Sequence, residues 1–135
     1  MSRPVVPNPF LRRVLWADAA VSGAVGVVMA AAAPLLEALT ALPAALLVPA
    51  GLALLPYAAY LVWLATRPAV PAGAVWVPIV LNGVWAVDCV WLMAAGAPRP
   101  TGLGLGFLAV QALTVLAFAE LEFVGLRRAR APLAA

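Results

Sequence analysis

The sequence contains no histidine, no lysine and a single cysteine, Cys89. These absences exclude a disulfide within the chain, a Cys/His zinc site and a haem ligated by histidine. Only carboxylates, tyrosines and arginines remain for acid–base chemistry, and no catalytic motif or cofactor fingerprint is present. We therefore predict that the protein is not an enzyme and that it binds no cofactor and no metal.

Charge is also scarce, because charged residues make up 10% of the 135 residues while hydrophobic residues make up 67%. Soluble domains carry about 45–50% apolar and about 25% charged residues. A chain this small cannot bury such an apolar excess in its own core, so the lipid bilayer is its predicted partner. The eight arginines lie at the ends of apolar runs and form no single stripe, so we predict no binding to nucleic acid.

Four runs are long enough to span the hydrocarbon core of a membrane, which takes about 20 apolar residues in a helix. They cover residues 14–33, 46–65, 75–95 and 103–126. Inside lipid, backbone groups must be satisfied within the segment, so these runs are predicted to be helices. Short connections between them predict one integral membrane domain over residues 1–135, an all-α up-down bundle of four transmembrane helices.

The arginines predict the orientation of the bundle, since cytoplasmic loops are rich in positive charge. Seven lie on one side of the predicted membrane and only Arg99 lies on the other. Both termini are therefore predicted to be cytoplasmic, and a belt of aromatic residues accompanies the same face: Trp16, Tyr60, Trp63, Trp76 and Phe123. Abundant alanine and arginine without lysine indicate a bacterium, hence a multi-pass protein of the inner membrane. In the alternative, the first run is a signal peptide cleaved after Ala33, but its length and Asp18 argue against this.

Ionisable residues within a span are costly and mark functional sites by default. Counting at about 1.5 Å per residue places one polar residue of each helix in a shared layer near the cytoplasmic face: Asp18, Tyr60, Asn82 and Glu120. This layer is a candidate proton site. Asp88 and Gln111 form a second candidate pair nearer the opposite face, where Asp88 is the deepest acid.

The helical wheel of the last span separates its two acids. Glu122 shares a face with Gln111 and Thr114, whereas Glu120 lies on the opposite face with Gly102 and Gly106. Acids near a helix end can also pair with arginines at the interface, which is the structural alternative for Asp18, Glu120 and Glu122. Because one small bundle cannot readily cover all these polar faces, the pattern indicates a homo-oligomer or a larger membrane complex.

Small residues at spacings of three or four predict where helix backbones approach closely. Gly102 and Gly106 open the last span, and Gly23 and Gly26 lie in the first. We expect these four glycines to take part in helix packing, more within the chain than between copies.

Two functions are compatible with these features. The first is an accessory or scaffold subunit that packs against other membrane proteins or against itself, since no motif specific to transport is present. The alternative is a proton- or cation-coupled transporter or channel for a small solute, formed by a homo-oligomer and using the acids inside the spans.

Overall fold

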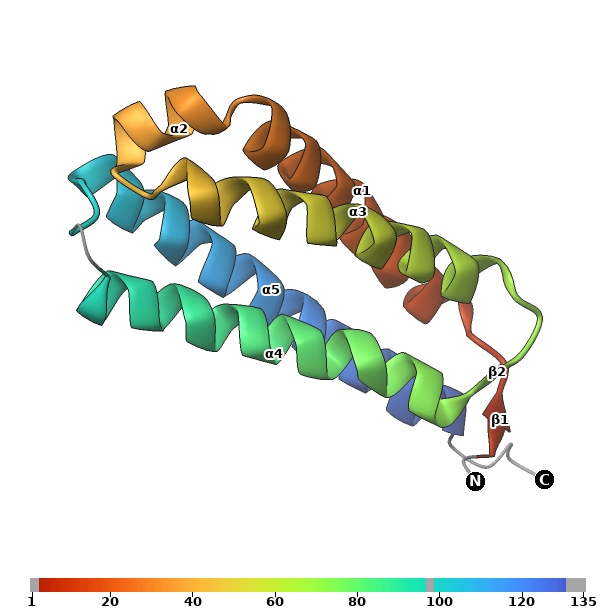
Figure 1. Ribbon diagram of the computed structural model, residues 1–135. Helices are drawn as coiled ribbons and strands as arrows, with labels where there is room; N and C mark the ends of the chain where they lie inside the picture. The colour runs from red at the N-terminus through yellow and green to blue at the C-terminus, as the bar shows by residue number, and fades with distance from the viewer. Residues whose placement is uncertain (1–2, 97–98, 131–135) are drawn as a thin grey trace.

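The computed structural model describes residues 3–96 and 99–130. Its regular structure is helical apart from two short strands, and the elements follow in the order β1 (Pro4–Val5), α1 (Pro9–Ala31), α2 (Ala33–Thr40), α3 (Ala44–Thr66), β2 (Val70–Pro71), α4 (Ala72–Ala95) and α5 (Gly102–Arg130). Four of the helices are long and apolar enough to cross a membrane. Figure 1 shows them as one elongated bundle. We call the end that carries β1 and β2 the sheet end, and the opposite end the α2 end.

The four predicted helices are confirmed, and each extends beyond its apolar run at one end or both, although α1 ends at Ala31, two residues before the predicted end. The first helix begins at Pro9, because the side chain of Asn8 accepts the N–H of Leu11 at 2.7 Å and a proline suits the first helical turn. The last helix continues to Arg130 and includes three arginines in its final turn. Cations there interact favourably with the carbonyl end of the helix, which explains the extension.

The connection predicted over residues 34–45 contains a further short helix, α2. Pro34 lies in its first turn, and Ala41 ends it in the left-handed conformation with φ of 61°. The Glu37 carboxylate accepts the N–H of Ala44 and so caps the start of α3. At the other side, Thr101 donates to carbonyls of Thr40 and Leu39, which ties α2 to the beginning of α5.

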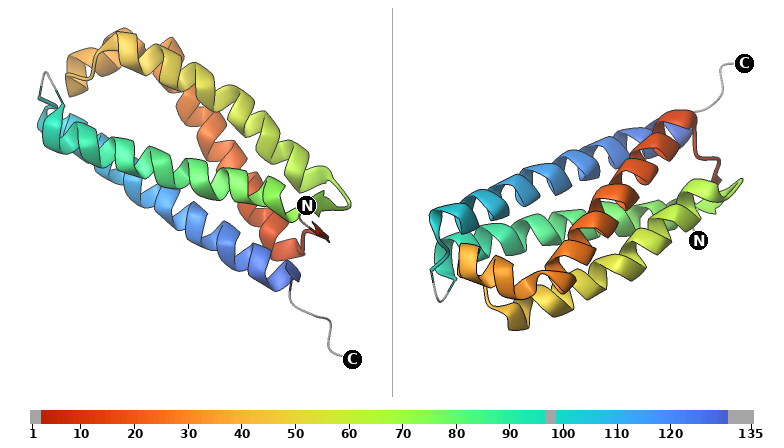
Figure 2. Two further views of the ribbon diagram at one scale, coloured as in Figure 1. Left: turned by 60° about the horizontal axis from the view of Figure 1, so that its bottom comes forward. Right: turned by 90° about the horizontal axis from the view of Figure 1, so that it is seen from above.

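The long helices associate as two close pairs, α1 with α3 and α4 with α5. Helices α1 and α5 join the pairs, whereas α3 and α4 touch very little (Figure 2). One apolar cluster fills the sheet end, with Leu11, Leu15 and Leu61 fully buried. A second fills the α2 end around Met29, Leu47 and Leu108. Between these clusters lie the buried polar residues Asp18, Asn82 and Glu122.

Glycine packing holds α1 against α3. A Cβ atom added to Gly26 would lie 2.8 Å from the carbonyl oxygen of Gly51, and one added to Gly51 would lie 2.7 Å from that of Gly26. Gly23 has only ordinary contact with Ala58. Gly102 and Gly106 do not pack within the described part of the chain, since an added Cβ would meet nothing within 4 Å. Their face of α5 points outward, and Gly104 packs against Thr40 instead.

Arg12 fastens the sheet end of the bundle. Its guanidinium donates to the carbonyl oxygens of Pro7 at 3.1 Å, Ala65 at 2.6 Å and Arg67 at 3.0 Å. It therefore satisfies carbonyls at the end of α3 that have no partner within that helix. The antiparallel pairing of β1 with β2 closes the same end, with Val5 opposite Val70.

The Arg12→Lys substitution is expected to destabilise the protein, because the compact lysine ammonium cannot reach all three carbonyls that the planar, branched guanidinium spans. Loss of hydrogen bonds from a charged donor should lower the free energy of unfolding by about 1–3 kcal/mol. Equilibrium unfolding in mixed micelles with increasing SDS measures this change. Arg13→Lys is the matched control, since Arg13 is exposed, and should change stability by less than about 0.5 kcal/mol. Equal effects of the two substitutions would argue against the contacts of Arg12.

Candidate intramembrane polar site

Each of the four long helices contributes one polar side chain to a layer between the two apolar clusters. These residues are Asp18, Tyr57, Asn82 and Glu122, each about eight to ten residues from the sheet end of its helix. At about 1.5 Å per residue, the layer lies about 12–15 Å into the bundle. Asp18, Asn82 and Glu122 are almost completely buried, with exposed fractions of 1%, 3% and 0%.

The Asp18 carboxylate is the centre of the layer and accepts three hydrogen bonds. Ser22, one turn further along α1, donates to Oδ1 at 2.8 Å. The Tyr57 hydroxyl and the Asn82 amide both donate to Oδ2 at 3.0 Å. All three donors are neutral, so hydrogen bonds rather than an ion pair stabilise this carboxylate.

Asn82 connects the two acids. Its Nδ2 donates to Asp18 and also to Oε1 of Glu122, at 3.1 Å. The other oxygen of Glu122, Oε2, is buried and has no hydrogen-bond partner among the described residues. A buried, unpaired carboxyl oxygen is unfavourable unless it carries or meets a proton or another donor. The layer thus contains two carboxyl groups that share one amide donor, and one carboxyl oxygen, Oε2 of Glu122, that has no partner among the described residues.

The structure brings together Asp18 and Asn82, two of the four residues expected in this layer. Tyr60 lies outside it, because its hydroxyl donates to the carbonyl oxygen of Ala74 at 2.6 Å and its ring stacks on Trp63. Tyr57, one turn deeper in α3, takes its place. Glu120 is exposed, and Glu122 is the acid that α5 contributes to the layer.

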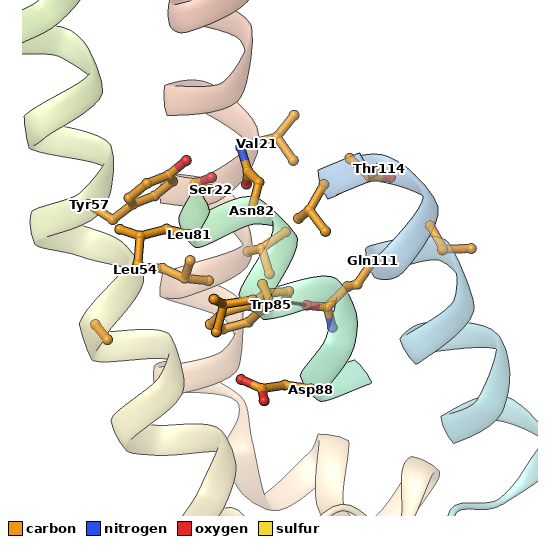
Figure 3. Close-up of a pocket in the computed structure, with 15 residues that line it drawn as sticks. Val21, Ser22, Leu54, Tyr57, Leu81, Asn82, Trp85, Asp88, Gln111 and Thr114 are labelled. Atoms are coloured by element: carbon orange, nitrogen blue, oxygen red, sulfur yellow. Dashed lines mark hydrogen bonds between the residues drawn. The ribbon is translucent and has the colours of Figure 1, made fainter. Parts of the chain in front are cut away.

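A cavity of about 350 Å³ lies next to the polar layer, between the two helix pairs (Figure 3). Ser22, Tyr57 and Asn82, which all contact the Asp18 carboxylate, form part of its wall. The rest is mainly aliphatic, and several lining side chains are exposed at the molecular surface, among them Leu81, Val84 and Val110. The cavity therefore leads from the outside of the bundle to the residues that hold the carboxyl groups.

The expected pair of Asp88 and Gln111 is not joined by a hydrogen bond. Gln111 instead accepts the indole N–H of Trp85 at 2.8 Å. All three residues line the main cavity and also a smaller one of about 90 Å³ on the side of the α2 end. Asp88 is exposed and lies about 9 Å along α4 from Asn82. It therefore belongs to the wall of the cavities and not to the buried layer.

The chemistry that this layer offers is that of carboxyl groups, which accept hydrogen bonds when ionised and donate one when protonated. Two carboxyl groups that share one amide in a medium of low dielectric repel each other if both are charged, so a proton or small cation between them is stabilised. Within residues 3–96 and 99–130, no three acidic or cysteine side chains gather as ligands for a metal ion. The donor set is suited to a proton more than to a divalent cation, which requires several oxygen ligands.

Comparisons with protein-family models, with curated proteins and with solved structures give no match. The four helices that are long and apolar enough to cross a membrane nevertheless indicate a class, that of multi-pass membrane proteins.

Proposed function

We propose that the protein is a proton-coupled carrier of a small solute in the bacterial inner membrane. The Asp18–Asn82–Glu122 layer would take up and release the proton, and the adjacent cavity would hold the solute. The observation that carries this proposal is the direct contact between them: Ser22, Tyr57 and Asn82 line the cavity and donate to Asp18. A solute in the cavity would therefore alter the hydrogen bonds on which the proton affinity of the carboxyl pair depends.

The proposed orientation is an up-down bundle with both termini in the cytoplasm. Arginines at the sheet end support it, in accordance with the positive-inside rule. Three of them lie over aromatic rings there: Arg67 over Trp63 at 5.6 Å, Arg127 over Phe123 at 5.8 Å and Arg128 over Phe10 at 4.9 Å. Aromatic and basic side chains together are typical of the membrane–water interface. In this orientation the polar layer lies in the cytoplasmic half of the membrane.

The proposal predicts that Glu122→Gln removes proton binding within the membrane. Protein reconstituted in liposomes on a solid-supported membrane is exposed to a rapid change of pH, and the transient current reports charge displacement. Wild-type protein should give a current that scales with the imposed pH step. The Glu122→Gln variant should reduce it at least tenfold, because the neutral amide preserves shape and hydrogen bonding but cannot exchange a proton.

Glu120→Gln is the matched control, since it makes the same change two residues away at an exposed position. It should leave the current unchanged. A wild-type current that persists in Glu122→Gln would contradict the proposed role of the carboxyl pair.

An accessory or scaffold role is the second candidate function, and the outward glycine face of α5 favours it. Gly102 and Gly106 are exposed without contact inside the described chain, on the face that also carries Glu120 and Leu113. Such a face allows a helix of a second copy or of another membrane protein to approach closely. Absence of any current from the wild-type protein, together with a stable complex mass in mild detergent, would favour this role over transport.

A further inference from the structure

Asp88 is the one charged residue in the walls of both cavities. The main cavity and the smaller one share Trp85, Asp88 and Gln111, and all their other lining residues are apolar or neutral. In Figure 3, Asp88 extends from α4 beside Trp85, below the level of Asn82. Asp88 is exposed on the bundle but lies inside a candidate membrane span, where a carboxylate among apolar residues lacks the hydration that stabilises it in water. An occupant that brings one positive charge would compensate for that loss.

The neighbouring aromatic residue adds to this preference for a cation. Trp85 is oriented by its hydrogen bond to Gln111, so its indole N–H is already engaged and its ring remains as an apolar wall of the cavity. Indole faces attract cations within about 6 Å of the ring centroid. An organic cation can therefore contact the Asp88 carboxylate with its charge and the Trp85 ring with its charge or its apolar body.

The size of the cavity limits the occupant. Its volume of about 350 Å³ is at the lower end of the range of about 300–1,000 Å³ found for small-molecule sites. A strongly hydrated inorganic ion would lose its water against an aliphatic wall and gain few ligands. A monovalent cation with an aromatic or aliphatic body matches both the single charge and the apolar lining.

We propose that Asp88 is the counter-ion of a binding site for a small monovalent organic cation, held in the main cavity against Trp85. This inference names the class of solute that the proposed carrier would transport, and to that extent it rests on the proposed function. Binding itself requires only the cavity and the carboxylate. Asp88 contacts the solute, whereas Asp18 and Glu122 exchange the proton in the buried polar layer.

The test compares benzyltrimethylammonium with neopentylbenzene, in which a carbon atom replaces the charged nitrogen. Binding to the purified full-length protein in nanodiscs of neutral phosphatidylcholine is measured by equilibrium dialysis, with empty nanodiscs to subtract partition into lipid. Wild-type protein should bind the cation at least tenfold more tightly than its neutral counterpart. Asp88→Asn should abolish this preference, and Asp88→Glu should retain at least part of it.

Glu122→Gln separates this inference from the proposed function. It should keep the preference for benzyltrimethylammonium over neopentylbenzene, because Asp88 is unchanged and Glu122 does not line the cavity. If Asp88→Asn keeps the preference for the cation, the inference is wrong, whatever the pH-jump current shows. If the preference depends on Asp88 but the wild-type protein gives no pH-jump current, the binding site is supported and the proposed carrier function is contradicted. The circular dichroism spectrum of Asp88→Asn should show the same helix content as wild-type protein. A loss of binding can then be assigned to the missing carboxylate and not to unfolding.

Discussion

Gly51→Leu is expected to lower the free energy of unfolding by about 3 kcal/mol or more. Overpacking in a core costs about 1–3 kcal/mol when neighbouring side chains can adjust, and more when they cannot. Here the added Cβ would meet backbone atoms, the carbonyl oxygen of Gly26 at 2.7 Å and the nitrogen of Ala30 at 2.8 Å. Only a separation of α1 from α3 would relieve these contacts, and that separation would weaken the packing along both helices. Equilibrium unfolding in mixed SDS micelles measures the loss.

Gly83→Leu is the matched control, because an added Cβ at Gly83 in α4 would meet nothing within 4 Å. Replacing a glycine inside a helix favours the helical state by up to about 1 kcal/mol. The control should thus be neutral or slightly stabilising. If the two leucine variants were equally stable, the close approach of α1 and α3 would be disproved.

Asp18→Leu is expected to lower the free energy of unfolding by about 2–5 kcal/mol. The substitution removes the acceptor of three donors, Ser22, Tyr57 and Asn82, and an unpaired buried donor costs about 1–3 kcal/mol. The total is smaller than the sum for three donors, because the Ser22 hydroxyl can instead donate to a carbonyl of its own helix. The same unfolding assay reports the effect.

Two further variants show whether hydrogen bonding causes that loss. Asp18→Asn keeps an acceptor oxygen in place and should cost about 1 kcal/mol or less. Glu120→Leu makes the same acid-to-leucine change at an exposed position of α5 and should be neutral or stabilising, since it removes an acid from an apolar environment. Destabilisation by Asp18→Asn as large as by Asp18→Leu would show that charge, rather than the hydrogen bonds, holds the layer together.

The four long helices could be predicted because length and hydrophobicity alone identify them. Their ends could not, because they depend on capping. Asn8 extends α1 outward beyond its apolar run, and the arginines after Leu126 remain helical. Helix α2 and the small sheet were also missed, since eight residues and two residue pairs carry too weak a periodic signal.

The depth of the polar site was predictable, whereas the identity of half its residues was not. Counting along each helix gave the correct level for Asp18 and Asn82. It could not choose between Glu120 and Glu122, or between Tyr57 and Tyr60, because one turn of helix changes depth little while rotation decides which side chain points inward. The helical wheel held the information that favours Glu122, because it places Glu122 on the same face of the last helix as Gln111 and Thr114. In the structure this face points inward: Gln111 and Thr114 line the cavity, and Glu122 is buried.

The contact between Asn8 and Gly125 joins the first segment of the chain to be synthesised to the last helix, and so concerns the order of assembly during synthesis. The Asn8 side chain donates to the Gly125 carbonyl at 3.2 Å, so the first helix meets the last. Chains are synthesised from the N-terminus, so α1 and α3 can pair before α5 has left the ribosome. Ser22 and Tyr57 can then donate their hydrogen bonds to Asp18 at that early stage. Glu122 arrives with the final helix. A nascent chain that lacks this helix holds one acid of the pair only, and the second is added in the last step of assembly.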